Sequence, residues 1–304
     1  KDEYTQIFTE LEAVAKVQSI KSSNAIEGIV TSDERIAAIV NQNSAPLNHN
    51  EAEIAGYRDA LNEIHLGYEH IDFRQSDILR LHEMMMSFAG YEYGGQYKTD
   101  DNVILEIDAD GNRRVRFHPT PASETPKAME QLELAYLAAR SEANINQLLL
   151  IPCVILDFLC IHPFNDGNGR MSRLLTLLLL YRSGYIVGKY ISIEKLISDT
   201  KETYYEALQA SSYNWHEGTN DYAPFVTYML GVLAAAYRDF EGRVELLTTK
   251  GLSKPDRVRE IIKNHLGKIT KSEIMAKCPD ISQITVQRAL TELLESGEIA
   301  KLSG

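Results

Sequence analysis

The fold is decided by a stretch in the middle of the chain, Leu156-Asp-Phe-Leu-Cys-Ile-His-Pro-Phe-Asn-Asp-Gly-Asn-Gly-Arg-Met-Ser-Arg-Leu-Leu-Thr-Leu-Leu-Leu-Leu180. An apolar segment stops at Pro163, because proline cannot continue a helix, and Gly167-Asn168-Gly169 provides a turn. An almost unbroken run of leucines follows, which is typical of a buried helix. We therefore expect two buried helices, over residues 145–160 and 169–183, joined by a glycine-rich loop that Phe164 anchors.

Helical periodicity dominates the rest of the chain as well. Apolar residues recur at spacings of three and four, which predicts further amphipathic helices over 3–25, 32–42, 50–69, 75–89, 123–141, 193–210, 221–248, 255–266, 270–278 and 282–296. One stretch differs: apolar residues alternate over 103–108 and 114–117 on either side of a turn at 109–113. This pattern predicts a β-hairpin. The expected fold class is therefore mainly α with one β-hairpin.

Composition narrows the class of protein. The chain has 304 residues, 44% of them hydrophobic, and a net charge of −12, which argues against a whole-protein nucleic-acid binder. Its three cysteines form no disulfide framework and suit a reducing compartment. The longest apolar stretch, Leu174 to Tyr181, is too short to cross a bilayer. We expect a cytoplasmic protein with no membrane partner.

The C-terminal segment differs from the rest in charge. Residues 251–304 hold nine Lys or Arg and seven Asp or Glu, a net of +2, whereas the remainder holds 22 and 36, a net of −14. Three short helical patterns followed by the strand-like segment 298–302 resemble a small winged helix-turn-helix domain. Such a tail can bind DNA through 282–296. Because its positive charge is small, a role in protein interaction or homodimer formation is preferred.

The central loop combines groups that suit a phosphate ligand. Free N–H groups at the start of the second helix, with the helix dipole, form an anion site, and glycines let a phosphate approach the backbone. Arg170 and Arg173 can reach phosphate oxygens. Asp166 beside them implies a bridging Mg²⁺. His162 can take a proton near neutral pH.

Each of these features alone is usually structural, because single histidines near helix ends and Gly-Asn-Gly turns are common. Their joint pattern is what points to a site. Two familiar nucleotide loops do not fit the sequence. Ser172 occupies the last glycine place of the dinucleotide fingerprint, and Gly188-Lys189 and Gly267-Lys268 lack the Ser or Thr that follows in a Walker A loop.

The pattern His162-x-Phe-x-Asp-Gly-Asn-Gly-Arg-x-x-Arg173 resembles in full the signature of the Fic (filamentation induced by cAMP) family. The resemblance covers about residues 50–215. It implies a Fic helical-bundle core that transfers AMP from ATP to a Tyr, Ser or Thr hydroxyl of a target protein, which the sequence does not name. It implies the following roles: proton acceptor for His162, Mg²⁺ ligand for Asp166, and nucleotide binding for Gly167, Asn168, Gly169, Arg170 and Arg173.

A second segment, Ser23-Asn-Ala-Ile-Glu27-Gly28, resembles the inhibitory motif of this family. The resemblance implies that Ser23, Glu27 and Gly28 form a brake, in which Glu27 pairs with Arg173 and occupies the site of the γ-phosphate. In some relatives the same glutamate orients a water that removes AMP. An AMP-removing or bifunctional enzyme is therefore one alternative. A transcription regulator that senses nucleotide is another.

Resemblance also suggests roles outside the loop. The hairpin, with Val103, Ile104 and Leu105, is similar to the family's flap, which docks the target as an added strand. Tyr205 resembles a residue that lines the adenine pocket. The expected domains are an N-terminal region with the inhibitory helix over 1–49, a Fic catalytic domain over 50–248 and a winged-helix domain over 255–304. The expected function is an autoinhibited protein adenylyltransferase that uses ATP and Mg²⁺ and can also modify itself.

Overall fold

The computed structural model describes residues 2–107, 113–248, 253–263 and 269–300. The chain divides into two compact units. The larger unit comprises residues 10–237, and the smaller comprises 1–9 with 238–304. The larger unit takes in residues 10–49 of the predicted N-terminal region and residues 50–237 of the predicted catalytic domain, whereas residues 238–248 of that domain belong to the smaller unit. The assignment of functional domains itself stays a prediction.

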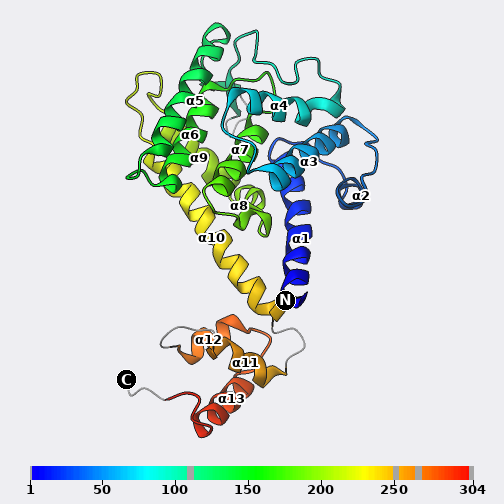
Figure 1. The fold of residues 1–304 in the computed structure, drawn as a ribbon, viewed down its shortest axis with the longest axis vertical. Helices are drawn as coiled ribbons and strands as arrows, with labels where there is room; N and C mark the ends of the chain where they lie inside the picture. Colours follow the sequence, from blue (N-terminus) through cyan, green and yellow to red (C-terminus); the bar gives the residue numbers. More distant parts are fainter. Residues whose placement is uncertain (1, 108–112, 249–252, 264–268, 301–304) are drawn as a thin grey trace. The chain divides into compact units, whose positions relative to one another are not determined.

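The described residues are mainly helical with one two-stranded sheet, which confirms the predicted fold class at that level. The helices up to the end of the larger unit are α1 (Asp2–Ile26), α2 (Asp33–Gln42), α3 (His49–Gly67), α4 (Gln75–Met86), α5 (Thr125–Ser141), α6 (Gln147–Ile161), α7 (Asn168–Arg182), α8 (Ile193–Asp199), α9 (Lys201–Ser212) and α10 (Ala223–Thr248). Short 3₁₀ turns lie at Ser87–Ala89, Ala122–Glu124 and Val187–Lys189. Figure 1 shows their arrangement.

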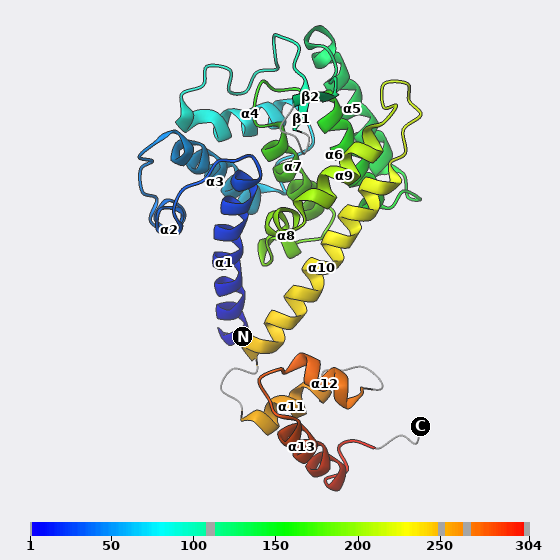
Figure 2. The same cartoon turned by 180° about the vertical axis from the view of Figure 1, so that it is seen from behind.

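Helix α7 is the centre of the larger unit. Every residue from Leu174 to Tyr181 is buried, as expected of a helix segment that is apolar on nearly all sides. The preceding turn, with Arg170 and Arg173, is buried as well. Helices α3 and α6 pack directly against α7, and both ribbon views place it in the middle of the unit (Figures 1 and 2). The run of leucines therefore forms the core around which the other helices assemble.

The single helix predicted over 193–210 is wrong, because the structure has two helices, α8 and α9. The backbone of Thr200 leaves the helical region with φ of −121° and ψ of 33°. Its hydroxyl donates to the carbonyl of Leu196 at 2.8 Å, and such side-chain bonds compete with the regular helix. The apolar period runs across the break because both helices bury residues in one core, Ile197 before it and Tyr204 after it.

The predicted hairpin is present. Strand β1 (Ile104–Ile107) pairs antiparallel with β2 (Arg113–Phe117), with an irregularity between Ile104 and Leu105. Val103 precedes the strand, and Asp108 and residues 109–112 of the predicted turn lie outside the described residues, whereas Arg113, the last residue of that predicted turn, begins β2. A two-stranded sheet needs a surface to lean on. Phe117 supplies part of that contact by stacking on His216 at 5.3 Å between ring centroids.

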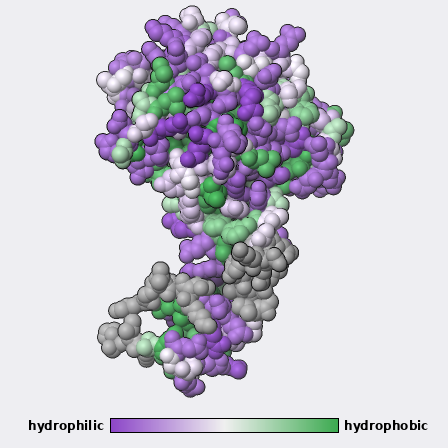
Figure 3. All heavy atoms as spheres, in the orientation of Figure 1, coloured by the Kyte–Doolittle hydropathy of each residue, from purple (hydrophilic) through white to green (hydrophobic). Residues whose placement is uncertain are grey.

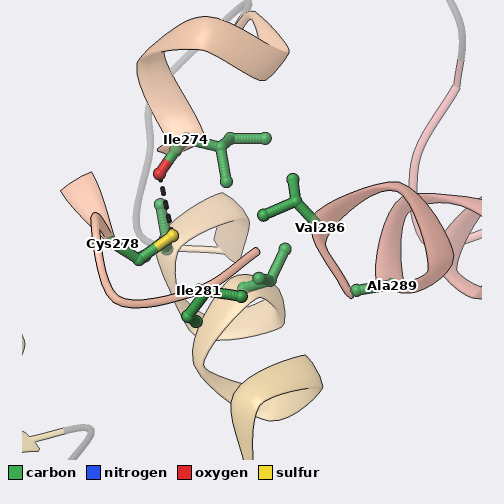
Figure 4. Close-up of a cluster of buried hydrophobic side chains, with 7 residues drawn as sticks. Ile274, Cys278, Ile281, Val286 and Ala289 are labelled. Carbon is green, nitrogen blue, oxygen red and sulfur yellow. Dashed lines mark hydrogen bonds between the residues drawn. The ribbon is translucent and has the colours of Figure 1, made fainter. Parts of the chain in front are cut away.

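The smaller unit has a core of its own. It contains α11 (Lys254–Lys263), α12 (Lys271–Lys277) and α13 (Gln283–Glu295), which bury a shared apolar cluster (Figure 4). Within that cluster the Cys278 thiol donates to the carbonyl of Ile274 at 2.9 Å. Residues 298–300 form no strand, and 301–302 lie outside the described residues. The winged part of this domain and its role in dimer formation or DNA binding therefore stay predictions.

The visible face of the larger unit is mostly hydrophilic, with hydrophobic residues scattered over it (Figure 3). Among the helices that the structure describes, none combines the length and the apolar character needed to cross a membrane. Cys153, Cys160 and Cys278 are free thiols in this structure.

Candidate active site

The loop begins where α6 ends, at a residue with an unusual backbone. His162 has φ of 52° and ψ of 61°, in the left-handed region that side chains other than glycine rarely adopt. Holding a residue there costs about 1–3 kcal/mol, and such strain gathers at functional sites. The following Pro163 prevents the helix from continuing. The chain turns sharply at this point and leaves the imidazole of His162 in the wall of a cavity.

The far side of the loop is closed by two side chains. Asn168 bonds both backbone groups of Phe164: its Oδ1 accepts from the amide N–H at 2.9 Å, and its Nδ2 donates to the carbonyl at 2.8 Å. The ring of Phe164 is fully buried, which confirms that it anchors the loop. Gly167 takes φ of 84°, a conformation that glycine adopts without strain, and opens helix α7.

His82 of α4 contacts the loop and stabilises its conformation, a role that the sequence did not indicate. Its ring stacks on Phe164 with 3.7 Å between centroids. The amide of Gly95 donates to Nδ1 at 3.0 Å, so the proton must sit on Nε2, which donates to the carbonyl of Asp166 at 3.0 Å. Burial lowers the pKa of His82 to about 4, which keeps the ring neutral and both bonds in place. A histidine in a buried helix face is a signal that such partners exist.

Lys98 and Asn102 also hold the loop backbone through hydrogen bonds. Lys98 is buried and donates through Nζ to the carbonyl of Ile161 at 3.1 Å and to Oδ1 of Asn102 at 2.8 Å. Asn102 Nδ2 donates to the carbonyl of Phe164 at 3.1 Å. Burial lowers the pKa of Lys98 to about 8. Together these two side chains hold the backbone on either side of His162 and stabilise its strained conformation.

A cavity of about 880 Å³ brings most of the predicted site residues together. Its wall includes the predicted residues Glu27, Ile104, Leu105, His162, Asp166, Gly167, Asn168, Gly169, Arg173 and Tyr205. Four predicted residues lie elsewhere: Arg170 and Ser23 are buried behind the wall, and Val103 and Gly28 are not part of it. Arg116 and Lys201, which sequence reasoning did not select, also line the cavity.

The imidazole of His162 is set up to accept a proton. Its Nδ1 lies 3.2 Å from the carbonyl of Leu159, and a carbonyl can only accept, so we assign the proton to Nδ1. Nε2 is then the free acceptor. Burial lowers the pKa of His162 to about 4, with a smaller contribution from the charge of Lys98. The ring is therefore neutral and able to act as a base across the physiological pH range.

The carboxylate of Glu27 occupies the anion site at the start of α7. Arg173 donates to Glu27 Oε1 at 2.7 Å, to the hydroxyl of Ser23 at 2.8 Å and to the Ser23 carbonyl at 2.9 Å. A Cβ placed on Gly169 would collide with Glu27 Oε1, so the carboxylate lies directly against the loop backbone. Burial alone would raise the pKa of Glu27, but the charge of Arg173 brings it below its ordinary value.

Comparison with known proteins agrees with this geometry. Residues 72–180, from the segment before α4 to the end of the leucine run, match the profile of the Fic/DOC family. This part of the chain, about a third of its length, is similar to the Fic/DOC family. It is 26% identical over 213 residues to protein adenylyltransferase fic-1 of Caenorhabditis elegans, which covers 68% of this chain and 37% of that protein.

Two further matches extend the likeness beyond residues 72–180. Protein adenylyltransferase Fic of Nematostella vectensis is 24% identical over 224 residues, 71% of this chain and 46% of that protein. The chain thus spans less than half the length of these two relatives. The crystal structure of a Fic family protein from Desulfovibrio desulfuricans superposes with a TM-score of 0.63 at 23% identity, over 94% of this chain and 81% of its own, a likeness in fold.

Within the matched segment, Arg170 points away from the cavity. Its guanidinium forms an ion pair with Glu53 of α3 at 2.6 Å, and both side chains are buried. Asp166 lies 3.6 Å away on its other side. The predicted contact of Arg170 with a nucleotide phosphate stays a prediction. In this structure the Arg170–Glu53 pair fastens the Fic loop to α3.

Asp166 fits the Mg²⁺ ligand that the Fic signature implies. Half of its side chain is exposed, and it lines the cavity. One oxygen accepts from the amide of Gly167 at 2.6 Å, which fixes the carboxylate and leaves its other lone pairs for a cation. The described residues contain no group of three or more His, Cys, Asp or Glu side chains that could hold a metal alone. A single carboxylate suits Mg²⁺ that shares its coordination with substrate phosphates and water.

Proposed function

We propose that this chain is a protein adenylyltransferase that moves AMP from ATP to a hydroxyl of a protein and is held back by Glu27. One observation carries the proposal. A proton acceptor, His162, a helix N-terminus with the amides of Asn168 and Gly169, and a buried cation, Arg173, all line one cavity of about 880 Å³. A nucleoside triphosphate needs these groups, and the relatives named protein adenylyltransferase support the same activity.

In the proposed reaction, a hydroxyl oxygen of the target attacks the α-phosphorus of ATP. A new P–O bond forms while the bond from that phosphorus to the β-phosphate oxygen breaks, and diphosphate leaves. The hydroxyl proton passes to Nε2 of His162. Amides of Asn168 and Gly169 at the start of α7 stabilise negative charge on the phosphates, and Arg173 binds the terminal phosphate. Asp166 would hold Mg²⁺, which supplies neutralisation of phosphate charge when it is bound.

The hairpin supplies a place for the target. Ile104 and Leu105 of β1 line the same cavity as His162. A target segment that added a strand here would bring a hydroxyl side chain toward the base. Val103 precedes this edge and would extend the pairing. Tyr205 lines the same cavity from α9 and supplies a ring for the adenine.

The brake follows from the position of Glu27. Its carboxylate rests on Gly169 and Arg173, where a terminal phosphate would have to bind. Ser23 adds to the brake by accepting two hydrogen bonds from Arg173, through its hydroxyl and its carbonyl. The chain ends α1 at Ile26 and turns at Gly28, which leaves Glu27 facing the loop. ATP must displace this carboxylate before it can bind productively.

The experiment follows protein-bound label from α-labelled and γ-labelled ATP in the presence of Mg²⁺. Wild type, Glu27→Gly and Glu27→Gly/His162→Ala are compared, alone and with cell lysate. The proposal expects label from the α-position only, strong in Glu27→Gly and absent in the double variant. Label from the γ-position would indicate phosphate transfer. No label from either nucleotide would argue against the proposed activity.

AMP removal is a second candidate for the same site. Glu27 lines the cavity together with His162, and about a third of its side chain is exposed. It can therefore orient a water toward a bound AMP-modified side chain. Release of AMP from a pre-modified target by wild type, lost in Glu27→Gly, would support this candidate. Equal release by both proteins would exclude a role for Glu27 in it.

A further inference from the structure

The end of α1 is held by polar contacts along one face, and they reach beyond the inhibitory motif. Ser19 donates to the buried carboxyl of Glu194 in α8 at 2.7 Å. One turn later Ser23 binds Arg173 of α7. At the last residue of α1, the carbonyl of Ile26 accepts from Nζ of Lys201 at 2.8 Å. Three helices therefore fasten three successive positions of α1, and the last contact lies next to Glu27.

Lys201 is an unusual residue for its own helix. It is the first residue of α9, where the helix dipole is positive and a cation is unfavourable. Its ammonium instead reaches the C-terminal end of α1, where the dipole is negative and the last carbonyls lack partners within the helix. A lysine at the start of a helix is locally unfavourable, and a residue that is unfavourable in its own helix but satisfies a distant contact is typical of a functional position.

The same ammonium lies beside the proposed brake. Lys201 lines the cavity with Glu27, and its Nζ is 5.9 Å from the centroid of the Tyr205 ring. After burial, which raises the pKa of Glu27, the charge of Lys201 is among those that lower it, together with Arg173 and Arg170. The turn that carries Glu27 is also closed by backbone bonds: the amides of Glu27 and Ile29 donate to the carbonyl of Asn24, and that of Gly28 donates to the carbonyl of Ala25, each at 3.0 Å.

We propose that Lys201 is a positioning residue that keeps Glu27 on Arg173 by holding the Ile26 carbonyl at the end of α1. This inference rests on the proposed role of Glu27 as a brake. Lys201 acts by ordering the last turn of α1, so that the carboxylate stays against Gly169. Without the ammonium, this turn opens more often and Arg173 becomes accessible to a phosphate.

If Lys201 only binds nucleotide, the change in nucleotide affinity on its removal has the opposite sign. If the ammonium only attracts phosphate, its removal weakens nucleotide binding whether or not Glu27 is present. If it holds the brake, its removal strengthens binding in the wild type and has no effect once Glu27 is gone. The two roles are therefore separated by the direction of the change and by its dependence on Glu27.

The first test measures amide hydrogen exchange of residues 24–29 in the full chain without nucleotide. Wild type, Lys201→Met, Lys201→Arg and the control Lys195→Met are compared. Lys195 lies on α8 and pairs with exposed Asp199 outside the cavity. Exchange should be about three-fold faster in Lys201→Met, the change expected of one cation at a helix C-terminus. Lys201→Arg and Lys195→Met should match wild type. Unchanged exchange in Lys201→Met would overturn the proposal.

The second test measures binding of the α,β-methylene analogue of ATP, which cannot donate AMP. Lys201→Met should bind it about three-fold more tightly than wild type, and Glu27→Gly/Lys201→Met should match Glu27→Gly. Weaker binding in both backgrounds would overturn the proposal and make Lys201 a nucleotide ligand. If this pattern holds but Glu27→Gly labels no protein, then AMP transfer fails while the role of Lys201 stands.

Discussion

Arg170 and Arg173 lie one turn apart on α7, and each pairs with one glutamate, but the two pairs face opposite sides of the loop. The Arg170–Glu53 pair lies behind it, with 1% and 6% of the side chains exposed. The Arg173–Glu27 pair lies in front, where Arg173 is 3% exposed and Glu27 is 32% exposed. Glu53 sits inside α3, whereas Glu27 follows the last residue of α1.

From this difference we infer that the Arg170–Glu53 pair stabilises the loop, whereas an anionic ligand can replace Glu27 in the Arg173–Glu27 pair. The carboxylate of Glu53 is fixed within a buried helix, and in this structure it pairs with Arg170. A carboxylate at a helix end, open to a cavity, can give way to another anion. A phosphate would therefore compete with Glu27 for Arg173 at the front of the loop. The Arg170–Glu53 pair at the back would hold the loop in place during that exchange.

The largest expected effect concerns the base at the front of the loop. In the Glu27→Gly background, His162→Ala should reduce AMP transfer by about 10²–10⁴-fold, since this is the usual contribution of a positioned general base. Binding of ATP should change little. Rates of label incorporation and calorimetric titration measure the two quantities. A variant that kept more than a tenth of the rate would contradict the role of His162.

The second prediction compares the two glutamates by stability. Glu53→Gln should lower the free energy of unfolding by about 3–5 kcal/mol, because it leaves Arg170 buried with only the half-exposed Asp166, 3.6 Å away, as a countercharge. Glu27→Gln removes a partly exposed partner and should lower it by less than about 1 kcal/mol. Urea unfolding of the two variants and wild type gives both values. Equal losses of unfolding free energy in the two variants would contradict the distinction between the Arg170–Glu53 and Arg173–Glu27 pairs.

The smallest expected effect is on the pH dependence. His162 must be neutral to act, and its pKa is about 4, so kcat/KM of Glu27→Gly should stay level from pH 8 to about 5 and fall below that. Glu27 also has a lowered pKa, so the brake stays charged over the same range. The ratio of Glu27→Gly to wild-type activity should therefore hold constant between pH 8 and 5.5. A fall in kcat/KM near pH 6.5 would show an unperturbed histidine.

Sequence alone predicts the front of this loop better than the back. His162, the glycine turn and Arg173 form one contiguous pattern, and their order follows from helix-breaking and helix-starting residues. The contact of Glu27 with Arg173 was reached through family resemblance and is present in the structure. Glu53 lies far from Arg170 in the sequence, and no pattern around Glu53 indicates that the two residues pair.

Two other features show why the remainder could not be predicted. His82 sits in an ordinary amphipathic helix, and only the tertiary structure brings it under Phe164. The break at Thr200 is invisible to apolar periodicity because α8 and α9 share one core. That break is what places Lys201 at the start of α9, within reach of Ile26. Long-range contacts and local backbone competition decide both cases.

The most direct test of Glu27 as the occupant of the phosphate site compares how Glu27→Gly changes the affinity for ATP and for adenosine, which carries no phosphate. ATP should bind at least ten-fold more tightly to Glu27→Gly than to wild type, while adenosine should bind both proteins equally. This result would place the competition at the phosphate contact of Arg173. An equal gain for both ligands, or no gain for ATP, would contradict the claim that Glu27 occupies the phosphate site.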